Sequence, residues 1–180
     1  MMNYVLMMYM VSLGSSNSLA TLVGNSIGMN EPRLARLFTR DGIFLAFSIC
    51  LILVSISAAC KNFILSFFTD DLKVIELLDS IFYLALVGIL LEVVQNAENG
   101  ILRGLGNLVW PSLTALFVYY VFFQPISISL LFNTDLGLLS IWVVLPFTPI
   151  LNGLAQFIMI YRTDFEHLAF RKHQLMKNGN

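Results

Sequence analysis

The sequence predicts an all-α integral membrane protein with about five transmembrane helices, and composition is the first reason. Of the 180 residues, 58% are hydrophobic and 12% are charged, and the mean hydropathy is +0.82. A soluble domain has about 25% charged residues, and a soluble chain of this size could not bury so much apolar surface in one core. We therefore expect a lipid bilayer around the chain. The net charge of -1, without a basic run, predicts no nucleic-acid partner.

The second reason is that five stretches are long and apolar enough to cross a bilayer, which takes about 20 residues. These predicted spans cover residues 4–28, 42–68, 75–103, 110–132 and 137–161. Pro32 is well placed to begin a short interfacial helix ahead of the second span. Pro125, Pro146 and Pro149 are expected to kink or open the last two spans.

The distribution of basic residues predicts which ends of the spans face the cytoplasm. Eight of the ten basic residues fall on one side of the predicted bundle: Arg33, Arg36, Arg40, Arg103, Arg162, Arg171, Lys172 and Lys177. Only Lys61 and Lys73 fall on the other side, and the positive-inside rule places the richer side in the cytoplasm. We expect a multi-pass protein with a transmembrane bundle over residues 1–161 and a cytoplasmic C-terminal tail over 162–180. The sequence leaves the membrane compartment open.

The third predicted span carries the main functional signal, a stripe of polar side chains on one helical face. Its members are Glu92, Gln95, Asn96, Asn99 and Arg103. Glu92 falls near the middle of its span, where an ionisable group is costly and is a candidate functional group by default. Glu98 points away from the stripe, and we expect it to pair with Arg103 or with a loop.

Glu92 is the residue to which we assign chemistry. Because an apolar environment favours the neutral form of a carboxyl group, Glu92 could bind and release a proton near neutral pH. A protonated glutamic acid can release its proton when a cationic substrate arrives and recapture it when the substrate leaves. Gln95, Asn96 and Asn99 would orient Glu92 or line a wet cavity. The alternative is a structural hydrogen bond from Glu92 to a neighbouring helix.

The first predicted span carries a second stripe, of small and polar residues. Its members are Gly14, Asn17, Thr21, Gly24, Asn25 and Gly28. Gly24 and Gly28 form a Gly-x-x-x-Gly pair, which lets helices approach closely in lipid. Asn17 and Thr21 are expected to line a cavity, with a tight hydrogen-bonded helix seam as the alternative. Tyr120 of the fourth span is a further cavity-lining candidate, with core packing as its alternative.

Motifs of enzymes and of metal sites are absent from the sequence. It has no glycine-rich phosphate loop, nucleophile elbow or HExxH motif. His167 and His173 lie in the charged tail without the spacing of a metal site. We therefore expect neither catalysis nor a cofactor or metal.

Several segments resemble, in order and with comparable spacing, those of eukaryotic antiporters of the multidrug and toxic compound extrusion (MATE) family. These are residues 18–28, the Gly-Ile-Leu-Arg-Gly-Leu-Gly-Asn run over 100–107, Tyr119 and Tyr120 with Pro125, Gly137 and Leu138 with Trp142, and residues 162–166. The sequence departs from the family pattern at Leu108 and Val109, where Gln and a basic residue are frequent. It departs again at Ser140, where a second glycine is expected.

The resemblance implies twelve helices in two six-helix lobes, of which this chain would supply the eighth to the twelfth. It places Glu92 on the acidic position of the tenth helix, eleven residues before Arg103 of the Arg-Gly motif, where the family exchanges protons and cations. Gly104, like Gly24, Gly28, Arg103 and Pro125, would be structural. The partner glutamate lies on a seventh helix that this sequence does not contain. The substrate would be an organic cation or xenobiotic, and the coupling ion a proton, with sodium as the alternative.

Three functions are therefore weighed for the chain. The leading one is a partial antiporter that exports organic cations when completed by an N-terminal lobe and a seventh helix. The second is a truncated, non-transporting membrane protein that persists or docks onto a full-length relative, because alternating access takes two halves. The third is a carrier of lipid-linked sugars, which would need a more cationic cavity than Arg103 provides.

Overall fold

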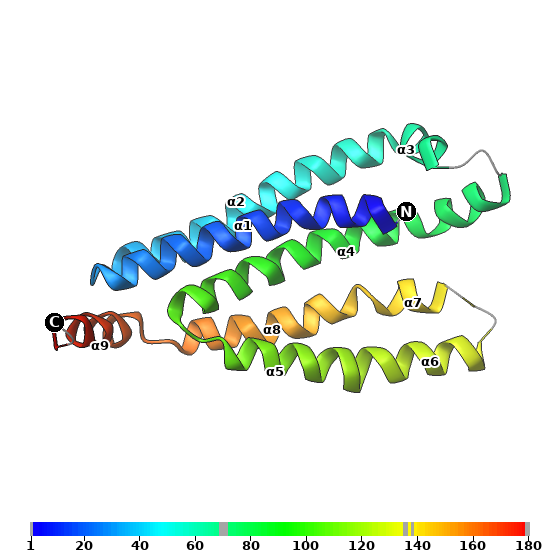
Figure 1. Ribbon diagram of the computed structural model, residues 1–180. Helices are drawn as coiled ribbons and strands as arrows, with labels where there is room; N and C mark the ends of the chain where they lie inside the picture. Colours follow the sequence, from blue (N-terminus) through cyan, green and yellow to red (C-terminus); the bar gives the residue numbers. More distant parts are fainter. Residues whose placement is uncertain (1, 69–71, 135–136, 138, 179–180) are drawn as a thin grey trace.

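The described part of the computed structural model, residues 2–68, 72–134, 137 and 139–178, is a bundle of long helices. Five helical segments are long and apolar enough to cross a membrane: Asn3–Gly28, Pro32–Ala59, Ile81–Leu105, Val109–Asn133 and Leu139–Arg162. They lie lengthwise beside one another, and the two termini lie at opposite ends of the bundle (Figure 1). The prediction of an all-α protein with five spans is confirmed.

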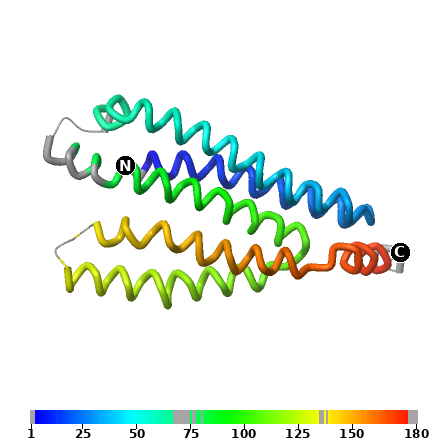
Figure 2. Tube along the Cα trace, turned by 180° about the vertical axis from the view of Figure 1, so that it is seen from behind, coloured from blue at the N-terminus to red at the C-terminus, as the bar shows by residue number. Residues whose placement is uncertain are grey.

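Helix α4 (Leu72–Leu105) occupies the middle of the bundle. It packs against α1 (Met2–Gly28) and α2 (Pro32–Ala59) on one side and against α8 (Phe147–Arg162) on the other. The two opposite views in Figures 1 and 2 show this division, with the fourth span alongside α8 at the far edge. Because α4 has neighbours on several faces, it can present different side chains to each of them.

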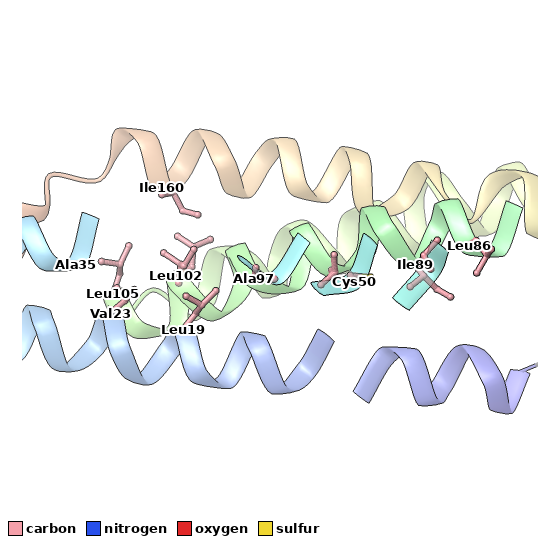
Figure 3. Close-up of a cluster of buried hydrophobic side chains, with 14 of the residues drawn as sticks. Leu19, Val23, Ala35, Cys50, Leu86, Ile89, Ala97, Leu102, Leu105 and Ile160 are labelled. Carbon is pink, nitrogen blue, oxygen red and sulfur yellow. The ribbon is translucent and has the colours of Figure 1, made fainter. Parts of the chain in front are cut away.

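The hydrophobic core lies where α4 meets these neighbours. Leu102 and Leu105 of α4 are buried with Val23 of α1 and Ala35 of α2, and Ile160 of α8 belongs to the same cluster (Figure 3). The outer faces instead carry large exposed apolar side chains. Among them are Phe44, which is 73% exposed, and Phe132, which is 80% exposed. Such surfaces suit a bilayer and not water.

Helices α1 and α4 approach each other closely at glycines of α4. A Cβ atom at Gly100 would clash with the backbone of Ser16, and one at Gly104 would lie 2.7 Å from the carbonyl oxygen of Ala20. The two backbones touch because neither glycine has a side chain, as in small-residue packing in membranes. We call this contact the glycine seam.

The glycine seam corrects the predicted Gly-x-x-x-Gly pair of the first span. Gly24 does face the seam, since a Cβ there would lie 3.4 Å from the carbonyl oxygen of Gly104. Gly28 has open space within 4 Å, so it allows no close approach in this bundle. The Gly-x-x-x-Gly pair that permits the close contact with α1 is Gly100 and Gly104 of α4.

The second span differs from the prediction at both of its ends. Pro32 does not begin a separate interfacial helix, because it stands at the first turn of α2, where its missing N–H costs nothing. Helix α2 then continues to Ala59, and α3 (Lys61–Phe68) is a separate short helix. Lys61, at the start of α3, holds the turn between α2 and α3 against α4. Its Nζ atom lies 2.5 Å from Oδ1 of Asp79 and 4.4 Å from the centre of the Tyr83 ring, and both residues belong to α4.

Prolines open the last two spans. The fourth consists of α5 (Val109–Phe117), a π-helical turn η1 (Val118–Phe123) and α6 (Gln124–Asn133). The π-helical turn directly precedes Pro125, which has no N–H to donate to an α-helical turn. The fifth span is broken between α7 (Leu139–Val144) and α8, with Pro146 in the break. Leu138, which contributed to the family resemblance, lies outside the described residues.

The predicted tail contains a further helix, α9 (Phe165–Asn178), which packs against α1 and α2. Asp164 caps its start, because Oδ1 accepts hydrogen bonds from the backbone N–H groups of Glu166 and His167. Helix α9 lies at the same end of the bundle as the turns after α1 and α4, and α3 lies at the other end (Figure 1). The basic residues are therefore separated as predicted, while the cytoplasmic orientation stays a prediction.

Candidate functional site

Glu92 lies at the edge of a cavity of about 260 Å³ inside the bundle. The cavity is lined by residues of α1, α4, the π-helical turn, α7, the break after α7 and the start of α8. Its walls are mainly apolar and aromatic: Val5, Leu6, Tyr9, Leu84, Ala85, Gly88, Ile89, Tyr119, Trp142, Leu145, Pro146, Thr148 and Pro149. Among the lining residues only Glu92 carries a charge. We call this space the Glu92 cavity.

The broken fifth span shapes one wall of the Glu92 cavity. Gly88 of α4 faces Pro146, since a Cβ at Gly88 would lie 3.8 Å from Cγ of the proline. Gly88 stands one helical turn before Glu92, so the break packs beside the carboxyl group. Discontinuous helices line substrate and ion sites in many secondary transporters.

Three aromatic residues of the cavity come from three different spans. Tyr9 comes from α1, Tyr119 from the π-helical turn and Trp142 from α7. Tyr120, predicted to line a cavity, is 71% exposed and lies outside this one, whereas its neighbour Tyr119 is inside. Tyr9 and Trp142 were not predicted to line a cavity. The signal for both was a polar aromatic side chain within a predicted span, and Trp142 also belongs to a segment that carries the family resemblance.

The polar stripe of α4 is divided between neighbouring helices. Asn96 is buried and its Nδ2 atom donates to Oγ of Ser12 at 3.0 Å, while its carbonyl accepts from Oγ of Ser16 at 2.6 Å. Gln95 is buried on the other side, with its Cβ 3.8 Å from a Cβ built at Gly153 of α8. Gln95 and Asn96 are adjacent in sequence and therefore point about 100° apart around the helix.

The remaining predicted cavity residues also lie outside the Glu92 cavity. Asn99 is half-buried, and Asn17 and Thr21 are exposed on α1, where the Thr21 hydroxyl donates to the carbonyl of Asn17 at 3.1 Å. Asn25 is exposed as well, so the polar side chains of this stripe are exposed while its Gly24 faces α4. The roles of these residues in transport stay predictions.

Arg103 joins α4 to α1 beside the glycine seam. Its Nη2 atom donates to Oγ of Ser16 at 2.9 Å and to Oδ1 of Asn17 at 3.2 Å. The expected pairing of Glu98 with Arg103 is therefore corrected, because Glu98 is 4% exposed and faces α8 instead. In a helix, positions five residues apart point to different sides.

Replacing Arg103 with alanine is expected to lower the thermal stability of the protein, because two hydrogen bonds from a charged group are lost. Each such bond contributes about 1.5–3 kcal/mol, so a clear fall in the unfolding midpoint in detergent is expected. Arg33→Ala is the matched control, since the Arg33 side chain is exposed. Equal midpoints for the two variants would contradict the assigned structural role.

The fold defines the class of protein as a multi-pass helical membrane protein with five candidate spans. A search with protein-family patterns finds that MatE matches residues 1–130, which is most of the chain. The chain therefore belongs to the MATE family, whose members are transporters and not enzymes. This finding confirms the family resemblance inferred from the sequence.

Individual relatives agree with this assignment. The chain is 28% identical to multidrug and toxin extrusion protein 1 of Homo sapiens over 137 residues, which is 76% of this chain and 24% of that protein. It is 28% identical to multidrug and toxin extrusion protein 2 of Mus musculus over 162 residues, which is 89% of this chain and 28% of that protein. The chain thus spans about a quarter of the length of these relatives.

The fold is also similar to that of a solved structure, the eukaryotic MATE transporter AtDTX14. The TM-score is 0.86 and the sequence identity 18%, and the match covers 93% of this chain and 37% of the other. At this identity the similarity describes the arrangement of the helices.

Proposed function

We propose that this chain is part of a MATE-type secondary transporter that exports organic cations in exchange for protons, with Glu92 as the exchanging carboxylate. The observation that carries the proposal is the Glu92 cavity, where a single carboxyl group stands among aromatic rings. A desolvated cation is stabilised both by a carboxylate and by the face of an aromatic ring. The names of the human and mouse relatives, multidrug and toxin extrusion proteins, agree with such a substrate.

The size of the cavity also agrees with a partial site. Ligand pockets usually measure about 300–1,000 Å³, and the Glu92 cavity, at about 260 Å³, is slightly smaller. An N-terminal lobe and a seventh helix, the partners expected from the family, would complete its walls. In this proposal the chain supplies the eighth to the twelfth helices and has its C-terminus in the cytoplasm.

Exposed polar side chains of α1 also support an assembly of this chain with an N-terminal lobe. Asn17, Thr21 and Asn25 are exposed on a helix of membrane-spanning length. Polar side chains within a span normally face a protein interior or a water-filled cavity and not lipid. The second lobe, or the aqueous pathway between the lobes, would provide that environment.

The proposed function is tested by measuring flux through the complete transporter that contains this chain, identified by long-read sequencing of the transcript. Purified protein in liposomes is expected to move radiolabelled tetraethylammonium when a pH gradient is imposed. Liposomes with a sodium gradient and no pH gradient are the control for the coupling ion. No tetraethylammonium flux under either gradient would contradict organic-cation transport, and flux under sodium alone would contradict proton coupling.

A further inference from the structure

The face of α4 opposite the glycine seam carries a second acidic residue, Glu98, at its contact with α8. Glu98 is 4% exposed, and a Cβ atom built at Gly153 would lie 3.2 Å from its Oε2 atom. The carboxyl group therefore rests against a helix position without a side chain. Glu98 is not among the residues that line the Glu92 cavity, so it belongs to a different part of the bundle.

Two carboxamide side chains flank Gly153 on the buried face of α8. Asn152 and Gln156 are four residues apart, so they lie on the same side of the helix, and both are 0% exposed. Within the described chain, neither the oxygen nor the nitrogen of either carboxamide has a hydrogen-bond partner, and Oε2 of Glu98 has none either. Buried polar groups are nearly always paired, so the unpaired carboxyl oxygen of Glu98 at this helix contact needs an explanation.

The charged and titratable groups of the neighbouring helices are directed elsewhere. Arg103 donates to α1. Helix α8 has no charged side chain before Arg162, which is exposed at its end beside the exposed Tyr161. The remaining described charged and titratable side chains of α4 and the helices packed against it lie in other parts of the bundle. Glu92 and Tyr9 line the Glu92 cavity, and Tyr4 and Cys50 lie in the core. Lys61 and Asp79 form an ion pair, and the exposed start of α2 carries Arg33, Arg36, Arg40 and Asp41. Within the described chain, Glu98 therefore has no cation to balance its charge.

From this geometry we propose that Glu98 holds a proton at the contact between α4 and α8, as a second proton-binding site that is separate from the Glu92 cavity. An ionised carboxylate buried without a cation is strongly disfavoured. The carboxamides of Asn152 and Gln156 carry no charge and make no hydrogen bond to Glu98 within the described chain, so they do not stabilise an ionised carboxylate. This site does not depend on the identity of the transported substrate.

The proton assignment has a structural consequence for α8. While Glu98 is neutral, Gly153 of α8 can remain packed against it. If the proton leaves, the carboxylate must gain water or a cation, and the contact between α4 and α8 must open to admit it. Protonation of Glu98 therefore stabilises the packed position of α8.

The proposal is tested by infrared spectroscopy of the 180-residue chain, purified and placed in lipid nanodiscs at neutral pH. A neutral carboxylic acid gives a C=O band that is separate from those of carboxylates and amides. The wild-type protein and the control Glu92→Gln are expected to show a band that is lost in Glu98→Gln. Glutamine resembles the neutral acid in shape, so Glu98→Gln should also keep the wild-type unfolding temperature. An identical band in wild type and Glu98→Gln would mean that Glu98 is ionised and would overturn the proposal.

A further measurement tests the ligand without removing Glu98. Sodium chloride and choline chloride should leave the wild-type band unchanged. Loss of the band with sodium chloride alone would identify a sodium ion as the ligand and overturn the proton assignment.

Discussion

Replacing Glu92 with glutamine is expected to reduce proton-coupled export by the complete transporter to the background rate, while the amount of protein in the membrane stays unchanged. Glutamine keeps the shape and the polarity of the side chain but cannot bind and release a proton near neutral pH. Among the described residues that line its cavity, Glu92 alone is charged. The measurement is pH-gradient-driven flux of tetraethylammonium in liposomes, with the amount of protein determined by immunoblot.

The matched control for this experiment is Glu31→Gln. Glu31 is exposed in the turn between α1 and α2, outside the Glu92 cavity, and undergoes the same chemical change. Its flux is expected to equal that of the wild type. Normal flux in Glu92→Gln would remove the exchanging role from Glu92 and leave it the structural hydrogen bond considered as the alternative. Loss of flux in both variants would show that the effect is not specific to the cavity.

Replacing Gly100 with alanine is expected to be strongly destabilising, since the added methyl group has no room. Its Cβ would clash with the backbone of Ser16, and backbone cannot move aside as a flexible side chain can. Overpacking of this kind costs about 1–3 kcal/mol or more. The measurement is the unfolding midpoint in detergent, followed by circular dichroism. The helices α1 and α4 are expected to separate at a lower temperature than in the wild type.

Gly14→Ala is the control on the opposite helix, because a Cβ at Gly14 has nothing within 4 Å. In a helix, alanine is favoured over glycine by roughly 0.5–1 kcal/mol. This variant is therefore expected to match or slightly exceed the wild-type stability. The two substitutions add the same atom and should act in opposite directions. A similar destabilisation by both would mean that the effect of Gly100→Ala does not come from the glycine seam.

The number of spans and the end-to-end division of the basic residues were predictable from the sequence. Both depend on local composition: about 20 apolar residues suffice to identify a span, and charges collect in the connecting turns. The importance of Glu92 was inferred for a similar reason, because an acidic residue in the middle of an apolar stretch is conspicuous before any contact is known. The structure then places it in a cavity.

The contacts between helices could not be predicted in the same way. The stripe from Glu92 to Arg103 looks like a single face on one helix, but α4 has neighbours on several sides. Asn96 and Arg103 therefore bond to α1, while Gln95 faces α8. Tyr119 and Tyr120 could not be assigned to faces either, because the π-helical turn changes the angle at which each side chain leaves the helix.

The glycine seam also has a mechanical consequence. Where α1 meets Gly100 and Gly104, backbone touches backbone, so no side-chain rotation can let the helices slide. The pair α1 and α4 is therefore expected to move as one stiff lever in any transport cycle. Hinges for such a motion must therefore lie outside the contact between α1 and α4. The described chain has two candidates, the π-helical turn before Pro125 and the break at Pro146. Both adjoin the Glu92 cavity, so a bend at either hinge changes the space around the carboxyl group directly.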